Sequence, residues 1–428
     1  MFTKKTIRDI NLKGKRVLLR ADYNVPVGKD GTITDDYRIT QSVPTLEYLK
    51  KQGAIIIIIS HLGRPKSPAD ESCSLQPVAK RLSKLLDTPV AFAPDCIGDV
   101  VKQKVAAMKP GDIILLENLR YHIQEEDNDT TFASELASMA DVFVQDGFGV
   151  VHRAHASTSA ITKFIPSVAG LLLEHEVDTI TNVMSDPKRP VMAVIGGAKI
   201  ADKITVLNRF IDIADFLVVG GAMANTFLRA QGVDIGKSLS DPDDVPLAKD
   251  ILERAAKEAK KRAFVFHLPT DGVVAKKLDS KTTTRIVDWG TQTIADIEDY
   301  PKIPGRNASK VDHDELILDI GPMTGAFIAG GMQLCNTVIW NGALGVTETP
   351  AVHGPIGPFS HGTEILVDAM LGQFGHRPFS VVGGGDTVGY VESRKLSGSF
   401  DHVSTGGGAG LELMSGKKLP GVEALQNA

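Results

Sequence analysis

Five consecutive isoleucines at positions 55–59 constrain the fold of this chain more than any other segment. Successive side chains of a strand point to opposite faces of the sheet, so an uninterrupted apolar run must be covered on both faces. Strands of this kind are typical of parallel sheets flanked by helices. We therefore expect the stretch from Gly53 to Ser60 to form a buried strand of an α/β fold.

Length and composition limit the class of protein. With 428 residues the chain is too long for one ordinary core, so two or three domains are expected. The net charge of -5 gives no general reason to expect a nucleic acid partner, and no apolar run has transmembrane length, so no membrane partner is expected. Three isolated cysteines argue against a disulfide framework and a structural zinc site, and together these features predict a cytoplasmic protein.

Basic side chains follow the expected strands of the N-terminal half. Any one of these basic residues could equally have a structural role or be a solvated surface side chain. A metal site at His152 and His155 is not expected, because no third ligand follows at a suitable spacing. Together, however, arginines at several strand ends suit a small molecule with several negative charges. The residues at or after these strand ends are Asp22, Asn24, Arg38, His61, Arg64, Arg120 and Arg153.

In the C-terminal half the expected strands end in glycines, which let backbone approach a ligand closely. After two glycines, Lys199 and Lys203 are four residues apart, which predicts one helix face that could hold phosphates, or else an ordinary surface helix. In one sheet such ends would line an extended ligand such as a nucleotide. Asp386, after three glycines, is either a magnesium ligand or a helix N-cap.

A long helix over 169–185, followed by the proline-punctuated segment DPKRP, is expected to connect the two domains.

Motifs along the whole chain resemble those of the phosphoglycerate kinase family. They are RADYNVP, HLGRP, LLENLRYH, DGFGVVHRAHAS, GGAKIADKI, VVGGAMANTFL, WNGALGV, VGGGDT and STGGGAGLELMSGKKLPGV. The resemblance implies two doubly wound Rossmann-like parallel-sheet domains joined by a hinge helix. It places a phosphoglycerate-binding domain at 1–170, the linker helix at 171–187 and a nucleotide-binding domain at 188–409. The tail from about 410 to 428 is expected to pack back on the first domain.

The resemblance also implies the site residues. In this family's pattern the substrate-binding residues are Asp22, Tyr23, Asn24, Arg38, His61, Leu62, Gly63, Arg64, Arg120 and Arg153. The nucleotide-binding residues are Gly196, Lys199, Lys203, Gly220, Gly221, Gly321, Asn341, Glu348, Gly384, Gly385, Asp386 and Thr387. Arg38 and Lys203 are the implied catalytic residues, Glu348 is implied to hold the ribose hydroxyls, and Asp386 is implied to hold Mg²⁺.

Some positions depart from the family pattern. Where the family has the proline of WNGP, this chain has Ala343, and where the family has the phenylalanine of GVFE, it has Thr347. The family's NDAFG is replaced by QDGFG. The stretch from Glu348 to Phe359 is longer than the family's connector. We expect these changes to surround the nucleoside end and to affect the choice of nucleotide.

The implied reaction is reversible phosphoryl transfer between 1,3-bisphosphoglycerate and ADP, giving 3-phosphoglycerate and ATP. An acyl phosphate needs no protein nucleophile, so catalysis reduces to alignment and charge neutralisation by cations. The expected protein is a monomer. Two rivals are an acyl-phosphate kinase for another small carboxylate, which should lack the arginine set, and an inactive nucleotide-binding protein, which should have lost Lys203, Arg38 or Asp386.

Overall fold

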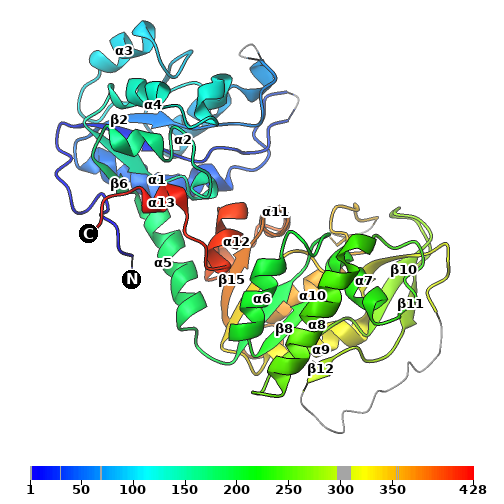
Figure 1. Ribbon diagram of the computed structural model, residues 1–428. Helices are drawn as coiled ribbons and strands as arrows, with labels where there is room; N and C mark the ends of the chain where they lie inside the picture. Colours follow the sequence, from blue (N-terminus) through cyan, green and yellow to red (C-terminus); the bar gives the residue numbers. More distant parts are fainter. Residues whose placement is uncertain (1, 29, 68–69, 296–309, 353, 355) are drawn as a thin grey trace. The chain divides into compact units, whose positions relative to one another are not determined.

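The computed structural model describes residues 2–28, 30–67, 70–295, 310–352, 354 and 356–428 (Figure 1). The chain forms two units, one of residues 1–181 with 405–428 and one of residues 182–404. Each unit has its own parallel sheet with helices packed against it.

The first unit contains a six-stranded sheet in the order β3-β4-β2-β1-β5-β6, in which every pair is parallel. Its strands are β1 (Arg16–Arg20), β2 (Ile55–Ile59), β3 (Val90–Phe92), β4 (Ile113–Leu115), β5 (Val142–Gln145) and β6 (Ser167–Ala169). All five isoleucines of β2 are buried. Ile56 and Ile58 belong to one core cluster and Ile57 to the other, so both faces of the sheet are covered, which confirms the expected α/β fold.

Helices lie between these strands in the chain, and one more follows the last strand. They are α1 (Tyr37–Lys51), α2 (Gln76–Leu85), α3 (Asp99–Ala106), α4 (Thr130–Ala137) and α5 (Leu171–Ser185). Short 3₁₀ turns follow several strands: η1 (Glu71–Cys73), η2 (Leu119–Tyr121), η3 (Ile123–Glu125), η4 (Phe148–Val150) and η5 (Ala160–Lys163). The predicted helix over 169–185 is thus present as α5, which begins in the first unit and ends in the second.

The end of the chain packs against the start of the chain within the first unit. It contains α12 (Gly408–Met414) and α13 (Pro420–Glu423). The Lys5 amide donates to the Gln426 carbonyl at 2.8 Å, and the Gly421 amide donates to the Val151 carbonyl at 2.9 Å. These bonds fix the tail beside β6 and η4.

The second unit contains a seven-stranded sheet in the order β12-β9-β8-β7-β14-β15-β16, parallel except for the edge strand β12. Its strands are β7 (Val191–Ile195), β8 (Phe216–Val219), β9 (Val265–His267), β12 (Ile294–Ala295), β14 (Thr337–Asn341), β15 (Phe379–Gly383) and β16 (His402–Val403). The helices and 3₁₀ turns are α6 (Ile204–Ile213), α7 (Gly221–Ala230), η6 (Pro242–Asp244), α8 (Val245–Ala259), α9 (Pro322–Met332), α10 (His361–Met370), α11 (Gly385–Ser393) and η7 (Ser397–Ser399).

A second sheet in this unit departs from the expectation of one sheet. Strands β10 (Asp271–Ala275), β11 (Arg285–Asp288) and β13 (Leu316–Ile320) form a three-stranded antiparallel sheet in the order β11-β10-β13. Gly321, expected at the end of a strand of the parallel sheet, therefore follows β13 of this second sheet. The mostly apolar sequence of β13 gave no signal of its partner strand, because strand pairing is a tertiary property.

The helix expected to carry both Lys199 and Lys203 begins later than predicted. Helix α6 starts at Ile204, so Lys203 is its N-cap residue and Lys199 lies in the preceding loop. The Asp244 carboxylate accepts hydrogen bonds from the amides of Ile200 and Ala201 at 3.1 and 3.3 Å. These bonds hold the loop outside the helix, so the two lysines do not share a helix face.

Throughout the described ranges, none of the helices combines the length and the apolar character needed to span a membrane.

Candidate active site

The predicted basic residues of the first unit follow neighbouring parallel strands. In the sheet, β4, β2, β1 and β5 are adjacent, so their carboxyl ends meet at one edge. The chain runs from β1 to β2 on one side and reaches β5 on the other, which makes this edge a topological switch point. Ligands of open α/β sheets bind at such points.

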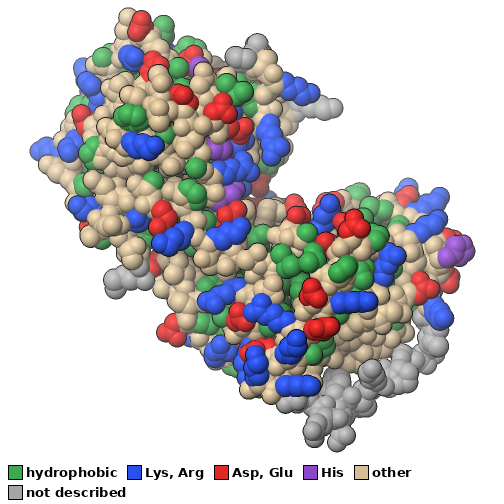
Figure 2. All heavy atoms as spheres, in the orientation of Figure 1, with side chains coloured by type: hydrophobic (Ala, Val, Ile, Leu, Met, Phe, Trp, Pro, Cys, Tyr) green, Lys and Arg blue, Asp and Glu red, His purple; other side chains and the backbone are tan. Residues whose placement is uncertain are grey.

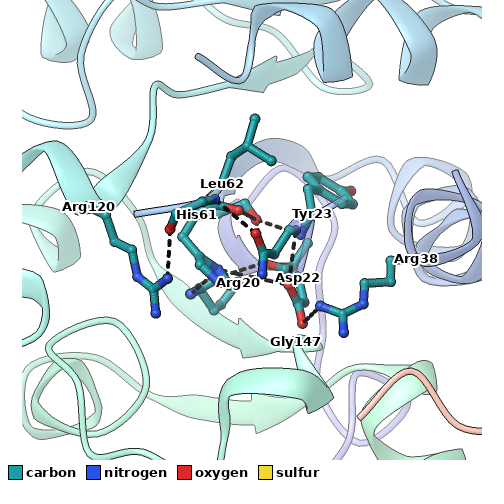
Figure 3. A network of polar contacts seen from close by, with 12 residues as sticks. Arg20, Asp22, Tyr23, Arg38, His61, Leu62, Arg120 and Gly147 are labelled. Atoms are coloured by element: carbon teal, nitrogen blue, oxygen red, sulfur yellow. Dashed lines mark hydrogen bonds and ion pairs between the residues drawn. The ribbon is translucent and has the colours of Figure 1, made fainter. Parts of the chain in front are cut away.

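Asp22, in the loop after β1, is the centre of a polar network (Figure 3). Its carboxylate accepts a hydrogen bond from the Arg38 guanidinium at 2.8 Å, and the His61 Nδ1 atom lies 3.9 Å away. Burial works to raise the pKa of Asp22, but Arg38, then His61, outweigh it and the pKa is lowered. Asp22 is therefore a carboxylate that fixes the position of Arg38.

Arg20, the last residue of β1, is fully buried and was not predicted as a site residue. Its Nε donates to the Ser157 hydroxyl at 2.8 Å, and its Nη2 lies 3.3 Å from Nδ1 of His61. The buried Glu125 carboxylate accepts hydrogen bonds from the Ser157 hydroxyl at 2.5 Å and from the Ser157 amide at 3.0 Å. Glu125 and Ser157 therefore tie Arg20 into the network that reaches His61.

His61 and the following loop are held from two sides. Burial keeps the pKa of His61 well below its usual value, so the ring is neutral at pH 7. The charge of Asp22 works to raise this pKa, and the charges of Arg20 and Arg120 lower it further. The Arg120 guanidinium donates to the Gly63 carbonyl at 2.8 Å, and Asn24 Oδ1 accepts from the Gly63 amide at 2.9 Å.

Smaller groups support the same loops. Gly63 has φ +62°, a backbone conformation that other residues adopt at a cost. The Leu62 amide is bonded to Asn118 Oδ1 at 3.3 Å. The Tyr23 side chain is buried with its hydroxyl 2.9 Å from the Ser42 hydroxyl, so Tyr23 supports the site from below and offers a ligand only its backbone.

Arg64 and Arg153 are exposed. Burial is the main cause that lowers the pKa of Arg120, and the nearby charges of Arg153 and Arg64 lower it further, while the charge of Glu126 acts in the other direction. Figure 2 shows Lys, Arg and His side chains grouped on the visible face of the first unit. The structure thus brings together all the arginines expected at this site. Cations without full compensation at one sheet edge form a site for an anion.

In the second unit the site is built around Lys203. Its ammonium donates to the Gly196 carbonyl at 2.7 Å, to the Asn341 side-chain oxygen at 2.7 Å and to the Asn341 carbonyl at 3.1 Å. Burial lowers the pKa of Lys203 to about 8, against the charges of Asp386 and Asp202, which raise it. Gly196 directly follows β7, and Asn341 is the last residue of β14. The sheet order reverses between these two strands, so Lys203 lies at the switch point of this sheet.

Glycines let three loops approach one another around this lysine. A Cβ atom at Gly196 would lie 2.0 Å from the Ala343 carbonyl oxygen, and one at Gly221 would lie 2.8 Å from the Gly197 amide nitrogen. At Gly220 it would lie 2.3 Å from the Leu344 side chain. Only glycine leaves space for these contacts.

The GGGDT segment lies beside the same group. Gly384 has φ +92°, and a Cβ there would lie 3.2 Å from Asn341 Oδ1. The Thr387 hydroxyl accepts a hydrogen bond from the Gly342 amide at 2.7 Å. Gly385 and Asp386 are exposed in the first turn of α11, whose N-cap is Gly384, so the N-cap interpretation of Asp386 is wrong.

Three predicted residues are not joined to this group. Lys199 and Glu348 are exposed in loops, and among the described residues no hydrogen bond or ion pair links either to Lys203. Residues 353 and 355 of the stretch after Glu348 lie outside the described residues. Gly321 caps α9, where a Cβ would lie 2.2 Å from the Asp271 carboxyl carbon.

Asp319, two residues before Gly321, is a buried carboxyl that was not predicted. Burial raises its pKa to about 7, although the amides of Ile320 and Gly362 donate to it at 2.8 and 2.9 Å. A Cβ at Gly345 would lie 2.3 Å from its Oδ1 atom. Asp319 therefore joins the end of β13 to the start of α10, and the loop after β14 passes close to it. Its signal in the sequence was a single acid in the apolar strand LILDI.

One departure from the family pattern lies elsewhere than expected. Gly147 of QDGFG is in the first unit, where a Cβ would lie 3.2 to 3.4 Å from the backbone of residues 20–22 (Figure 3). An alanine at this position would press on the loop that carries Asp22. The change in QDGFG therefore lies in the first unit beside Asp22, and not in the second unit with Ala343 and Thr347.

Comparisons with known proteins agree with this arrangement. Residues 7–417 match the family model described as phosphoglycerate kinase. The phosphoglycerate kinase of Chloroherpeton thalassium is 45% identical over 426 residues, covering 99% of this chain and 100% of the relative. That of Moorella thermoacetica is 44% identical over 424 residues, covering 99% of each. The solved phosphoglycerate kinase of Coxiella burnetii is 35% identical, with a TM-score of 0.79 over 98% of both chains. The chain belongs to the phosphoglycerate kinase family.

Proposed function

We propose that this protein is a phosphoglycerate kinase, which transfers a phosphoryl group reversibly between 1,3-bisphosphoglycerate and ADP. The observation that carries the proposal is the full-length family match, which spans both sites described above. The residues of those sites supply the cations that the reaction requires, so the inactive nucleotide-binding alternative is disfavoured.

The first unit binds the phosphoglycerate. Arg64, Arg120 and Arg153 supply positive charge for its phosphate and carboxylate, and their mutual repulsion is relieved when an anion binds. The neutral His61 donates or accepts a hydrogen bond without adding charge. Arg38, held by Asp22, stabilises charge on the transferring phosphoryl group.

The second unit binds ADP and ATP. The glycines after β7 and β8 and at the start of α11 allow backbone amides to approach the phosphates. Lys203 exchanges its carbonyl partners for phosphate oxygens and neutralises the charge that develops during transfer.

Magnesium fits the exposed Asp386 carboxylate. Near phosphates Mg²⁺ takes oxygen ligands and usually only one or two carboxylates, which matches this single acid after the glycines. When bound, Mg²⁺ supplies charge neutralisation at the phosphate oxygens. Asp386 would hold it, while Thr387 fixes the loop through its bond to Gly342.

No side chain needs to act as nucleophile or general base. The acyl phosphate carries a good leaving group, and ADP brings its own attacking oxygen. The work of the protein is therefore alignment and electrostatic stabilisation, and a monomer in the cytoplasm meets these needs.

The proposal is tested by a coupled assay with 3-phosphoglycerate, ATP and Mg²⁺, run beside acetate, glycerate and aspartate as alternative acceptors. We expect turnover with 3-phosphoglycerate to exceed turnover with each alternative by at least roughly 10³-fold, because the arginine set recognises both of its anionic groups. A preference for another carboxylate would favour the rival acyl-phosphate kinase.

A further inference from the structure

Three potential metal ligands of different chemistry meet in the first unit, apart from the expected Mg²⁺ ligand. Asp95 and Cys96 lie in the loop after β3, and His122 follows η2. One ligand atom from each lies within 4.8 Å of the other two. His122 Nε2 and Asp95 Oδ1 are 2.7 Å apart. Two loops that follow neighbouring strands thus place a carboxylate, a thiol and an imidazole together.

We propose that Asp95, Cys96 and His122 form a binding site for a transition-metal dication of the Zn²⁺ type. Zn²⁺ is bound by thiolate, imidazole and carboxylate, whereas Mg²⁺ prefers oxygen ligands alone. On binding, the Cys96 thiol releases its proton to solvent as its sulfur bonds the metal, with no change in oxidation state.

The distances require only a small adjustment. Bonds of about 2.0 to 2.3 Å in a tetrahedral site place ligand atoms roughly 3.2 to 3.8 Å apart. A separation of up to 4.8 Å must therefore close by about 1 Å, and the contact between Asp95 and His122 must open by less than that. Both changes lie within the reach of side-chain rotation in a loop.

The three side chains differ in exposure, which suits a metal site with one position left for water. Cys96 is fully buried, whereas the side chains of Asp95 and His122 are 50% and 24% exposed. A metal could reach the thiol from the exposed side and keep a water molecule as its fourth ligand. The His122 ring also lies 5.3 Å from the Phe132 ring, which limits its orientation.

The local charge also favours a cation at the thiol. The carboxylates of Asp95 and Glu125 both act on Cys96. The carboxylate field that opposes a bare thiolate favours a thiolate paired with a dication. The sequence argued against zinc because it lacks closely spaced cysteines, but that argument applies to structural four-ligand sites and not to a site with three ligands and water.

The test is a titration of the full-length, metal-free protein with Co²⁺, which gives a thiolate-to-metal charge-transfer band only when sulfur is bound. We expect one equivalent of Co²⁺ to produce the band and one equivalent of Zn²⁺ to remove it. C96S should abolish the band. H122N and D95N should weaken binding by roughly 10- to 100-fold or more, the range found for loss of supporting groups at metal sites.

The matched control is C73S, which removes another buried cysteine of the same unit and should leave the band unchanged. Circular dichroism of each variant identifies a loss caused by misfolding, and a folded D95N still tests the site if C96S does not fold. Absence of the band in the folded parent, or its persistence in C96S, would overturn the proposal. Neither outcome depends on kinase activity.

Discussion

Each unit has a candidate site at the carboxyl edge of its own parallel sheet, but the residues at the two edges differ in kind. In the first, the switch point between β1 and β5 carries a chain of buried polar side chains, in which Ser157 links Glu125 to Arg20 and Arg20 reaches His61. In the second, the switch point between β7 and β14 carries glycines and one half-buried lysine that is bonded mainly to carbonyl oxygens. Topology therefore decides where each site lies but leaves its chemistry to local sequence.

The difference matches the shape of the two ligands. A small acid with charges at both ends is recognised by guanidinium groups whose directions are fixed in advance by carboxylates. A nucleotide's phosphate chain needs close backbone approach, which side chains would obstruct. The first site should therefore be sensitive to lost charge, and the second to added volume.

The largest effect is expected from Glu125→Gln in the first unit. This change removes the stronger of the two carboxylate charges that act on the buried Arg20, and the loss of one partner of a buried charge network typically costs about 3 to 5 kcal/mol in the free energy of unfolding. Urea unfolding measures the loss. Glu135→Gln, which breaks the surface pair with Lys102, should cost less than about 1 kcal/mol. Equal losses in the two variants would show that the buried network has no special role.

Lys203→Ala should come next and should act on catalysis. Removing a preorganised contact to the transition state lowers kcat by roughly 10²- to 10³-fold. Steady-state kinetics with 3-phosphoglycerate and ATP measure it. Lys257→Ala, on the exposed side of α8, is the control and should retain the parent kcat. A decrease of only a few-fold in Lys203→Ala would contradict the central role of this lysine.

Residues at strand ends could be predicted from the sequence, because a parallel sheet brings successive strand ends to one edge whatever their distance in the chain. The chain pattern found Asp22 and His61 in this way, whereas Asn341 came from the resemblance to the family. It missed Arg20, which reads as the last residue of a strand, and Glu125, which reaches Arg20 only through Ser157. Contacts made through an intermediate residue leave no spacing signal.

The same limit explains the errors in the second unit. The start of α6 depends on Asp244, which lies more than 40 residues away and holds the loop amides of Ile200 and Ala201. The antiparallel sheet of β10, β11 and β13 depends on pairing between distant segments. Local patterns predicted strands and helices well, but not which distant group ends a helix or pairs a strand.

Added volume should affect the glycine-lined site moderately. In Gly196→Ala the new methyl group would overlap the Ala343 carbonyl, and overpacking of this kind costs about 1 to 3 kcal/mol. We expect nucleotide affinity, measured by calorimetry, to fall by roughly 10-fold or more, while 3-phosphoglycerate affinity stays near the parent value. Gly330→Ala, in α9 with open space around it, is the matched control and should bind nucleotide normally. Normal nucleotide binding by Gly196→Ala would remove the proposed contrast between the two sites.

The smallest effect is expected from pH, and it also separates the two sites. Burial holds the pKa of Lys203 at about 8, so the free enzyme loses this charge as pH rises through 8, and kcat/KM should fall above that pH. Bound phosphates favour the charged ammonium, so the corresponding fall in kcat should lie at higher pH. Between pH 8 and 10.5 the unfolded chain binds more protons at this lysine than the folded protein does, so Lys203 makes stability rise with pH there. Lys203→Arg keeps its charge throughout and should abolish the fall in kcat/KM near pH 8, even if its rate is lower. A fall that persists in Lys203→Arg would have to come from another group.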